Sequence, residues 1–134
     1  HYLPTGEILS TGSCPEHEVD IQVPLPGAKV ANGAADWSAD YYDVATKTVR
    51  KKPQRPSEFH EFDYLGKSWR FNSERAWASV RAARDAKLLA TDWTQLPDVP
   101  LQAKEAWAAY RQALRDVTKQ PDPLKVVWPE PPTT

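Results

Sequence analysis

Hydrophobic and polar residues alternate over short segments in the first half of the chain. Three segments repeat the order aromatic residue, polar turn, large apolar residue: "HYLPTGEIL", "YYDVATKTV" and "EFDYLGKSW". Aligned on Gly6, Thr46 and Gly66, each turn has an aromatic residue four positions before it. Alternation around a tight turn is typical of a β-hairpin, and glycine tolerates the positive φ that such turns use. We therefore predict three short hairpins, which must pack on a neighbour because an isolated hairpin is marginally stable.

The segments between these repeats carry two further patterns. Val19, Ile21 and Val23 alternate strictly before Pro24, which predicts one more strand. The stretch "RKKPQRPSEFHEF" contains two prolines and is expected to be an extended connector or a sheet edge. A local basic cluster consists of Lys47, Arg50, Lys51, Lys52 and Arg55. We interpret it as protection of a sheet edge against pairing with other chains, in preference to an anion site.

From Asn72 onward the hydrophobic period becomes helical. A first helix is predicted with Ser73 as N-cap and an end near Leu89 or Ala90. Its apolar face comprises Ala76, Trp77, Val80, Ala83 and Leu88. Arg84 and Lys87 lie within this face, and we expect both to bury their stems and keep their charges in water.

A second helix is predicted along "LQAKEAWAAYRQALRDV", with Asp98 as N-cap and Pro100 in the first turn. Its stripe comprises Ala103, Ala106, Trp107, Tyr110, Ala113, Leu114 and Val117. The short connection makes the two helices an antiparallel hairpin whose apolar stripes face each other. The following "KQPDPLKVVWPEPPTT" is too rich in proline for a helix, and Trp128 is the residue able to anchor it.

The patterns together predict an α+β protein. Residues 1–72 form a region rich in β-hairpins, and residues 73–134 form a helical hairpin with an extended proline-rich tail. The predicted core of the helical region consists of Trp77, Val80, Leu88, Trp107, Tyr110 and Leu114.

Composition restricts the function. The 134 residues include 17 Lys plus Arg and 18 Asp plus Glu, so the net charge is −1 and no basic field is available to hold nucleic acid. No apolar run approaches the roughly 20 residues that a membrane helix needs. The single Cys14 cannot form an internal disulfide and no signal-peptide pattern opens the chain, so we expect a soluble protein of a reducing cytoplasm.

The candidate chemistry for catalysis is sparse. His1, His17 and His60 share no metal-ligand spacing, and Cys14 has no base beside it other than His17, three residues away across a proline. On an alternating strand, His60 and Phe62 face the opposite way from Glu61 and Asp63. We therefore predict a protein that is not an enzyme and that has no metal and no cofactor.

The second half resembles the tail assembly chaperone domain of tailed bacteriophages. The residues that carry this resemblance span roughly 81–131: Arg84-Asp85, Leu88-Leu89, Thr91-Asp92-Trp93, Pro97-Asp98, Trp107, Tyr110-Arg111, Leu114-Arg115-Asp116 and Trp128-Pro129. In the first half, "YYDVATKTV", "KPQRPSEFHEFDY" and "KSWRFN" resemble the N-terminal parts of phage tail fibre and tail fibre assembly proteins. Related sequences place a proline after Leu-Arg-Asp, where this chain has Val117-Thr118-Lys119, and this difference leaves the end of the second helix open.

The resemblance implies a non-enzymatic protein that helps a tail fibre, baseplate or tail-tip component to fold, trimerise or become attached. It implies action in the host cytoplasm, and leaves open whether the protein departs or stays in the virion tail as a structural subunit. Self-association or a trimeric fibre partner also stays open. The candidate partner-binding residues are Trp93, Trp128, Pro129, Tyr42 and Trp69. The alternative is a glycan-binding module for host recognition, based on Tyr41, Tyr42, Tyr64 and Trp69.

Overall fold

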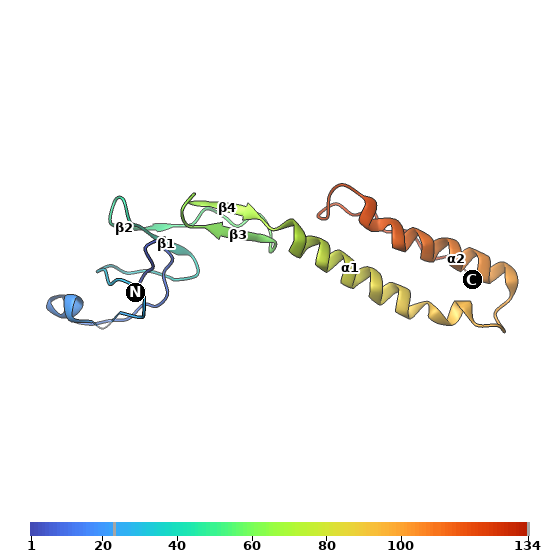
Figure 1. The fold of residues 1–134 in the computed structure, drawn as a ribbon, viewed down its shortest axis with the longest axis horizontal. Coiled ribbons are helices and arrows are strands. Elements are labelled where there is room, and N and C mark those ends of the chain that lie inside the picture. The colour runs from blue at the N-terminus through green and yellow to red at the C-terminus, as the bar shows by residue number, and fades with distance from the viewer. Residues whose placement is uncertain (23, 134) are drawn as a thin grey trace. The chain divides into compact units, whose positions relative to one another are not determined.

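The computed structural model describes residues 1–22 and 24–133. They form two compact units, His1–Phe71 and Asn72–Thr134. The first unit contains the strands β1 (Asp40–Asp43), β2 (Thr48–Lys51), β3 (His60–Asp63) and β4 (Ser68–Phe71), and the second contains the helices α1 (Ser73–Ala90) and α2 (Leu101–Asp116) (Figure 1). The predicted α+β class is confirmed.

Two of the three predicted hairpins are formed by regular strands, and they have the same construction. β1 pairs antiparallel with β2, from Asp40 opposite Lys51 to Asp43 opposite Thr48. β3 pairs with β4 in the same register, from His60 opposite Phe71 to Asp63 opposite Ser68. The repeated pattern in the sequence therefore corresponds to a repeated structural element.

The predicted hairpin at the start of the chain is present only as a minimal antiparallel pairing without regular strands. Tyr2 forms isolated antiparallel bridges to Ile8, across the turn at Gly6, and to Lys29 of a further chain segment. The N–H groups of Leu3 and Gly6 bond within the loop, to the carbonyls of Glu7 and Leu3. Pro4 has no N–H to donate, which limits further pairing.

The predicted strand around Val19 and Ile21 is wrong. Glu16–Ile21 forms a 3-10 helix, η1, directly after Pro15. Glu16 and Glu18 occupy its first turn, where the partial positive charge of a helix N-terminus favours acidic side chains. Ile21 is 72% exposed, and Val23 lies outside the described residues.

Helix α1 ends at Ala90, within the predicted range, but its N-cap is Asn72 and not Ser73. The Asn72 side chain accepts a hydrogen bond of 3.0 Å from the N–H of Arg75. Ala76 and Val80 are buried, Trp77 and Leu88 are half-buried, and Ala83 is exposed, contrary to prediction. Arg84 occupies the half-buried position between Val80 and Leu88, because the buried stripe follows a spacing of four residues.

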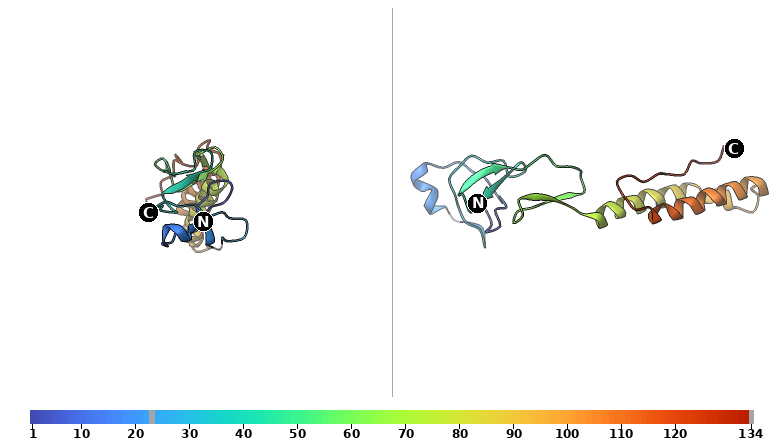
Figure 2. Two further views of the ribbon diagram at one scale, coloured as in Figure 1. Left: turned by 90° about the vertical axis from the view of Figure 1, so that its left-hand side faces the viewer. Right: turned by 90° about the horizontal axis from the view of Figure 1, so that it is seen from above.

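Helix α2 lies antiparallel beside α1 (Figures 1 and 2), as predicted. Pro100 occupies the N-cap position without a side-chain cap, so Asp98 is not the cap. The helix ends at Asp116 and tightens into a 3-10 turn, η3 (Val117–Lys119). Of the predicted stripe, Ala106 and Ala113 are exposed, while four large side chains form its buried part: Trp107, Tyr110, Leu114 and Val117.

The core of the second unit is a cluster of Trp107, Tyr110 and Leu114. Leu88, Ala103 and Trp128 pack against this cluster, so α1, α2 and the C-terminal segment all contribute to it. After η3 the chain makes one turn, in which the N–H of Lys125 bonds to the carbonyl of Asp122, and then continues without helix or strand to residue 133.

Candidate functional site

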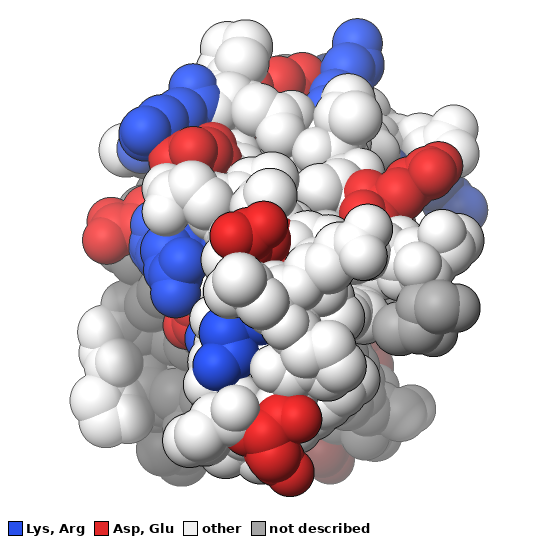
Figure 3. Space-filling view, turned by 90° about the vertical axis from the view of Figure 1, so that its right-hand side faces the viewer, with Lys and Arg blue, Asp and Glu red and all other residues white. Residues whose placement is uncertain are grey.

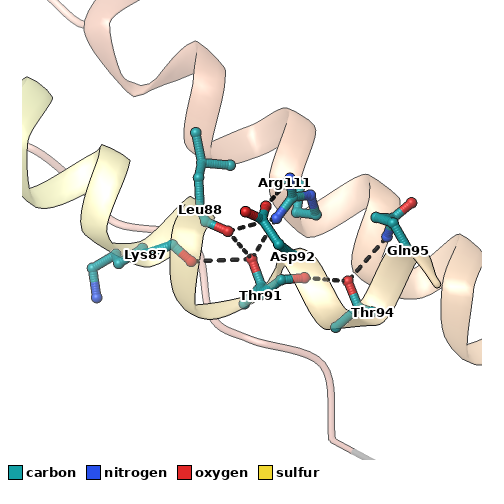
Figure 4. Close-up of polar contacts among 7 residues, drawn as sticks. All are labelled: Lys87, Leu88, Thr91, Asp92, Thr94, Gln95 and Arg111. Atoms are coloured by element: carbon teal, nitrogen blue, oxygen red, sulfur yellow. Dashed lines mark hydrogen bonds and ion pairs between the residues drawn. The ribbon is translucent and has the colours of Figure 1, made fainter.

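The connection between α1 and α2 is organised around the guanidinium group of Arg111 (Figure 4). One of its terminal nitrogens, Nη1, donates to the carbonyl oxygen of Leu88 at 2.7 Å and to Thr91 Oγ1 at 2.8 Å. The other, Nη2, donates to Asp92 Oδ1 at 2.8 Å. The Arg111 side chain is 11% exposed, so the two bonds from Nη1 are partly shielded from water, whereas the bond to Asp92 lies at the surface because the Asp92 side chain is 59% exposed.

These contacts cap the C-terminus of α1. The last carbonyls of a helix have no partner within the helix. The Thr91 hydroxyl donates at 3.0 Å to the carbonyls of both Lys87 and Leu88, and Arg111 from α2 adds a second bond to Leu88. A positive charge is also favourable next to the negative end of the helix dipole.

The network continues into the 3-10 helix η2 (Asp92–Gln95), which forms most of the connection. The Thr94 hydroxyl is fully buried and donates to the carbonyl of Thr91 at 2.6 Å, and Gln95 Nε2 donates to Thr94 Oγ1. Thr91-Asp92 and Tyr110-Arg111, which carry the family resemblance, are therefore joined in one polar network. The sequence pattern alone does not predict a contact between residues so far apart. The only signal was that both segments carry the resemblance to the same family.

This ordered connection presents large apolar side chains to solvent. Leu89 is 74%, Trp93 52%, Leu96 52% and Leu101 71% exposed, and we call these four residues the tip surface. One edge of the Trp93 ring contacts Trp107, with ring centroids 5.9 Å apart, so the indole is held in place while half of it stays exposed. Figure 3 views the molecule from the side of this connection, where uncharged residues occupy most of the face between single acidic and basic side chains. Large apolar side chains exposed together on an ordered connection are typical of an interaction site.

Trp128 fixes the C-terminal segment to the helix pair. Its ring packs against the core cluster and lies under the ammonium group of Lys87, at 5.5 Å from the ring centroid. The Gln120 side chain forms two hydrogen bonds with the backbone of Val127. Its amide nitrogen donates to the carbonyl of Val127 and its amide oxygen accepts from the N–H of Val127, both at 2.9 Å. Pro129 is half-buried directly after this anchor.

The two candidate residues of the first unit are engaged in packing. Tyr42 is 9% exposed, and the centroids of the Tyr42 and Tyr2 rings are 4.1 Å apart. Trp69 is half-buried, donates from Nε1 to the carbonyl of Pro53 at 2.7 Å, and has the guanidinium of Arg55 over its ring.

The other aromatic residues proposed for glycan stacking are also covered. Tyr41 is 7% exposed and packs on Phe62, while Lys52 lies over the ring of Tyr64 and donates to its hydroxyl at 3.1 Å. Alternation along a strand suggested one exposed face, but both faces of β1 are covered. Tyr41 and Tyr42 are buried and Tyr64 and Trp69 are half-buried, so all four rings are engaged in packing within the first unit.

The basic cluster is divided among separate partners. Arg50 pairs with Asp43, Lys52 contacts Tyr64, and Arg55 donates to the carbonyls of Glu58 and His60. These contacts hold the two hairpins and their connector together.

The carboxylate of Asp43 has four close polar partners, and sequence reasoning did not identify this residue. Its side chain is 4% exposed and accepts hydrogen bonds from Lys67 Nζ at 2.9 Å and from the N–H groups of Ala45 and Thr46. Arg50 Nε lies 3.2 Å from its second oxygen. The lysine bond is the main cause that lowers the pKa of Asp43 to about 2.

Within residues 1–22 and 24–133 no group of three or more His, Cys, Asp and Glu side chains could hold a metal ion. No helix of this part of the chain has the length and apolar character to cross a membrane.

Comparison with protein families gives a match in the second unit. Residues 77–133 match the family model of the phage tail assembly chaperone protein. The matched region contains the tip surface, the Arg111 network and Trp128, and it supports a phage tail assembly chaperone domain with a role in tail assembly. Comparisons with curated proteins and with solved structures gave no match. The similarity of the first half to tail fibre proteins stays a prediction.

Proposed function

We propose that this protein assists the assembly of a phage tail without catalysing a reaction, and that its helical unit binds a tail polypeptide through the tip surface. The observation that carries the proposal is the family match over residues 77–133, which includes all four tip residues. An assembly chaperone acts through protein partners, and exposed apolar side chains on an ordered support are suited to such contacts.

The Arg111 network favours binding because it orders the tip in advance. Fixing a flexible loop during association costs free energy, which an already ordered loop avoids. Thr94, Thr91 and Arg111 hold the connection by hydrogen bonds that are buried or partly shielded from water. Trp93, half exposed and supported by Trp107, has the properties of an interface anchor.

We propose a tail fibre, baseplate or tail-tip protein as the partner, bound during assembly in the host cell. Trp69, Trp128 and Pro129 remain secondary candidates for the contact, since each is half-buried and retains accessible surface. Tyr42 is left out of the proposed surface because Tyr2 covers it.

The double variant Leu89→Lys, Leu101→Glu tests the proposal. Both residues are more than two-thirds exposed, at 74% and 71%, and lie where the new charges suit the helix dipoles: Lys near the C-terminus of α1 and Glu at the N-terminus of α2. The fold should therefore be retained. Co-expression with the tail fibre and baseplate polypeptides of the same phage, tested separately, should show capture of one of them, weakened at least about tenfold in the variant.

A matched control is Ile21→Lys, which introduces the same charge at a side chain that is 72% exposed in the first unit. It should leave capture unchanged. Equal capture of wild type and double variant would contradict the tip surface as the binding site, and no capture of any tail polypeptide would contradict the assembly role.

Retention in the particle requires a separate measurement. Tryptic cleavage should release the peptide Leu88–Lys104, which spans the whole connection. Mass spectrometry of purified particles would detect it in stoichiometric amounts if the protein is a structural subunit. Its absence from particles, with abundance in the lysate of infected cells, would identify an assembly factor that dissociates.

A further inference from the structure

The C-terminal segment of the second unit covers the helix pair by side-chain packing and not by hydrogen bonds. Residues 120–133, which we call the strap, contain no helix or strand and lie alongside α1 and α2 (Figure 2). The polar contacts of the strap are internal, because the Gln120 side chain bonds to the backbone of Val127 and Asp122 closes one turn. Among the described residues, no hydrogen bond or ion pair joins residues 121–133 to either helix.

Trp128 is the large side chain by which the strap contacts the core. Its ring packs against the core cluster of the helical unit, and the ammonium group of Lys87 lies 5.5 Å from the ring centroid. The ring is only half-buried, and the neighbouring Val127 is 76% exposed. Segments with few buried apolar contacts open locally at a small cost in free energy. The strap can therefore leave the helices without breaking a hydrogen bond to them.

Proline keeps the strap extended whether or not it lies on the helices. Proline fixes its own φ and has no N–H group that needs a partner. The ordering cost is therefore small each time the strap returns to the helix pair. The prolines of the strap are Pro121, Pro123, Pro129, Pro131 and Pro132.

The strap and the tip surface meet on the same core cluster. The ring centroids of Trp93, in the tip surface, and Trp107, in the cluster, are 5.9 Å apart, and Trp128 packs against that cluster. Trp107 is 9% exposed with the strap in place. Departure of Trp128 would uncover apolar surface that continues the tip surface, and a larger contiguous apolar surface is better suited to hold a protein partner.

We propose that the strap regulates the tip surface by competing with the bound tail polypeptide for the core cluster. An aromatic side chain of the tail polypeptide takes the position of Trp128, so that the contact extends from Trp93 across Trp107. This inference rests on the proposed function. The chemistry of the competing segment follows from the strap itself, because the structure shows an extended segment with a tryptophan next to a proline in this position.

A tethered competitor makes binding selective. A segment attached to the same chain competes at an effective concentration on the order of millimolar. The apparent affinity of any other ligand falls by the fraction of chains in which the site is open. A partner segment with an aromatic residue alone is therefore held off, whereas a partner that also contacts the tip surface gains enough to displace the strap.

The first experiment uses the intact chain and the strap sequence as a free peptide, and it needs no tail polypeptide. The probe is QPDPLKVVWPEPPT, residues 120–133. Titrated into the isotopically labelled Trp128→Ala chain, it should shift the indole N–H signal of Trp107 in a saturable manner. Binding should be at least about tenfold tighter than to the wild-type chain, whose own strap occupies the site. The same peptide carrying Trp128→Ala should not saturate.

Val127→Ala is the matched control within the strap. It shortens a side chain that is 76% exposed and keeps both backbone bonds to Gln120, so the chain should bind the peptide as weakly as wild type. Gln120→Ala is a second release variant, because it removes these two bonds and leaves the core cluster unaltered. It should bind the peptide about threefold more tightly than wild type. If Trp128→Ala unfolds the helical unit, Gln120→Ala decides the question.

Two results of the titration would overturn the proposal. One is the absence of saturation at a few millimolar peptide in both release variants, and the other is equal binding of the peptide to the release variants and to wild type. A wild-type dimer that grows with protein concentration and dissociates on addition of the peptide would overturn the choice of occupant, in favour of straps exchanged between two copies.

The second experiment separates this inference from the proposed function. A tail polypeptide captured by wild type should be captured at least about threefold more strongly by Trp128→Ala, and the free peptide should compete with it. Weaker capture by Trp128→Ala would show that Trp128 contacts the partner, which overturns the strap as a competitor and leaves the tip surface as the binding site. Capture of no tail polypeptide by either chain would contradict the proposed function and the regulatory role together, whereas peptide binding to Trp128→Ala would still show that the strap is removable.

Discussion

The two units of this protein reach stability in different ways. The core of the helical unit is a stripe of side chains on α2, centred on Leu114 at 0% exposure. The Arg111 network caps the C-terminus of α1 at the connection between the helices. The hairpin unit has strands of four residues and depends on contacts between segments: Tyr2 on Tyr42, and Lys67 on Asp43. The comparison teaches that short hairpins gain a core only by combining with one another.

The largest effect is expected from a cavity in the helical core. Leu114→Ala should lower the free energy of unfolding of the helical unit by about 3 kcal/mol, because the site is completely buried. Hydrogen exchange should accelerate in α1 and α2 while β1–β4 keep their protection. Leu101→Ala, at a position 71% exposed, should change stability by less than about 0.5 kcal/mol. Equal loss of protection in both units would show that they unfold together.

The next largest effect is expected from the Arg111 network, which caps the C-terminus of α1. Arg111→Leu removes both bonds from Nη1 and should cost about 2 kcal/mol, since the Leu88 carbonyl and Thr91 hydroxyl lose a shielded donor. Thermal unfolding of the helical unit measures the loss, and hydrogen exchange at Thr91 locates it. Arg81→Leu, at an exposed position of α1, is the control. Similar destabilisation by both variants would contradict a specific role for the network.

A substitution of Gly6 tests whether the N-terminal loop supports the hairpins. Gly6 has φ of +99°, and a Cβ there would collide with the carbonyl oxygen of Tyr42. Gly6→Ala should therefore destabilise the hairpin unit by about 1–2 kcal/mol. Gly12→Ala, where a Cβ meets no atom within 4 Å, should be nearly neutral. Unchanged amide protection of β1 in Gly6→Ala would show that the N-terminal loop does not support the hairpins.

The smallest expected effect is the dependence of the stability of the hairpin unit on pH. The pKa of Asp43 is lowered from 3.8 to about 2, mainly by Lys67, so the folded state favours the ionised carboxylate. Its stabilisation is complete above the ordinary pKa and decreases as the pH falls through about 2. Lys67→Gln should raise the pKa of Asp43, measured by NMR titration of its carboxyl group, and weaken protection of β1. A pKa that stays near 2 in this variant would assign the shift to the turn N–H groups.

Much of the helical unit could be predicted because its information is local. The spacing of Trp107, Tyr110 and Leu114 indicated the buried stripe, and the resemblance directed attention to Thr91, Asp92 and Arg111. The helix caps were less predictable. Asn72 and Ser73 are both good capping residues, and Asn72 stands at the position whose side chain reaches the Arg75 N–H.

For the hairpin unit, the sequence predicted the individual hairpins but not how they pack together. The repeated turns indicated where the chain reverses, but alternation of residue types cannot show that both faces of a strand are covered. Tyr42 therefore looked available for a partner, although Tyr2 covers it. The strand expected around Val19 was wrong because the segment after Pro15 forms a 3-10 helix, which alternation over so few residues cannot exclude.

The sequence by itself determined the α+β class, the two hairpins of regular strands, the helix pair and the resemblance of the second half to tail assembly chaperones. These features depend on periodicity, turn chemistry and motif order, all of which are written in neighbouring residues. The tertiary structure alone decided which side chains stay exposed in the connection between the helices, that Arg111 caps the C-terminus of α1, and that Lys67 of the second hairpin bonds to Asp43 of the first. Each of these depends on contacts between residues distant in the chain, and local pattern does not encode such contacts.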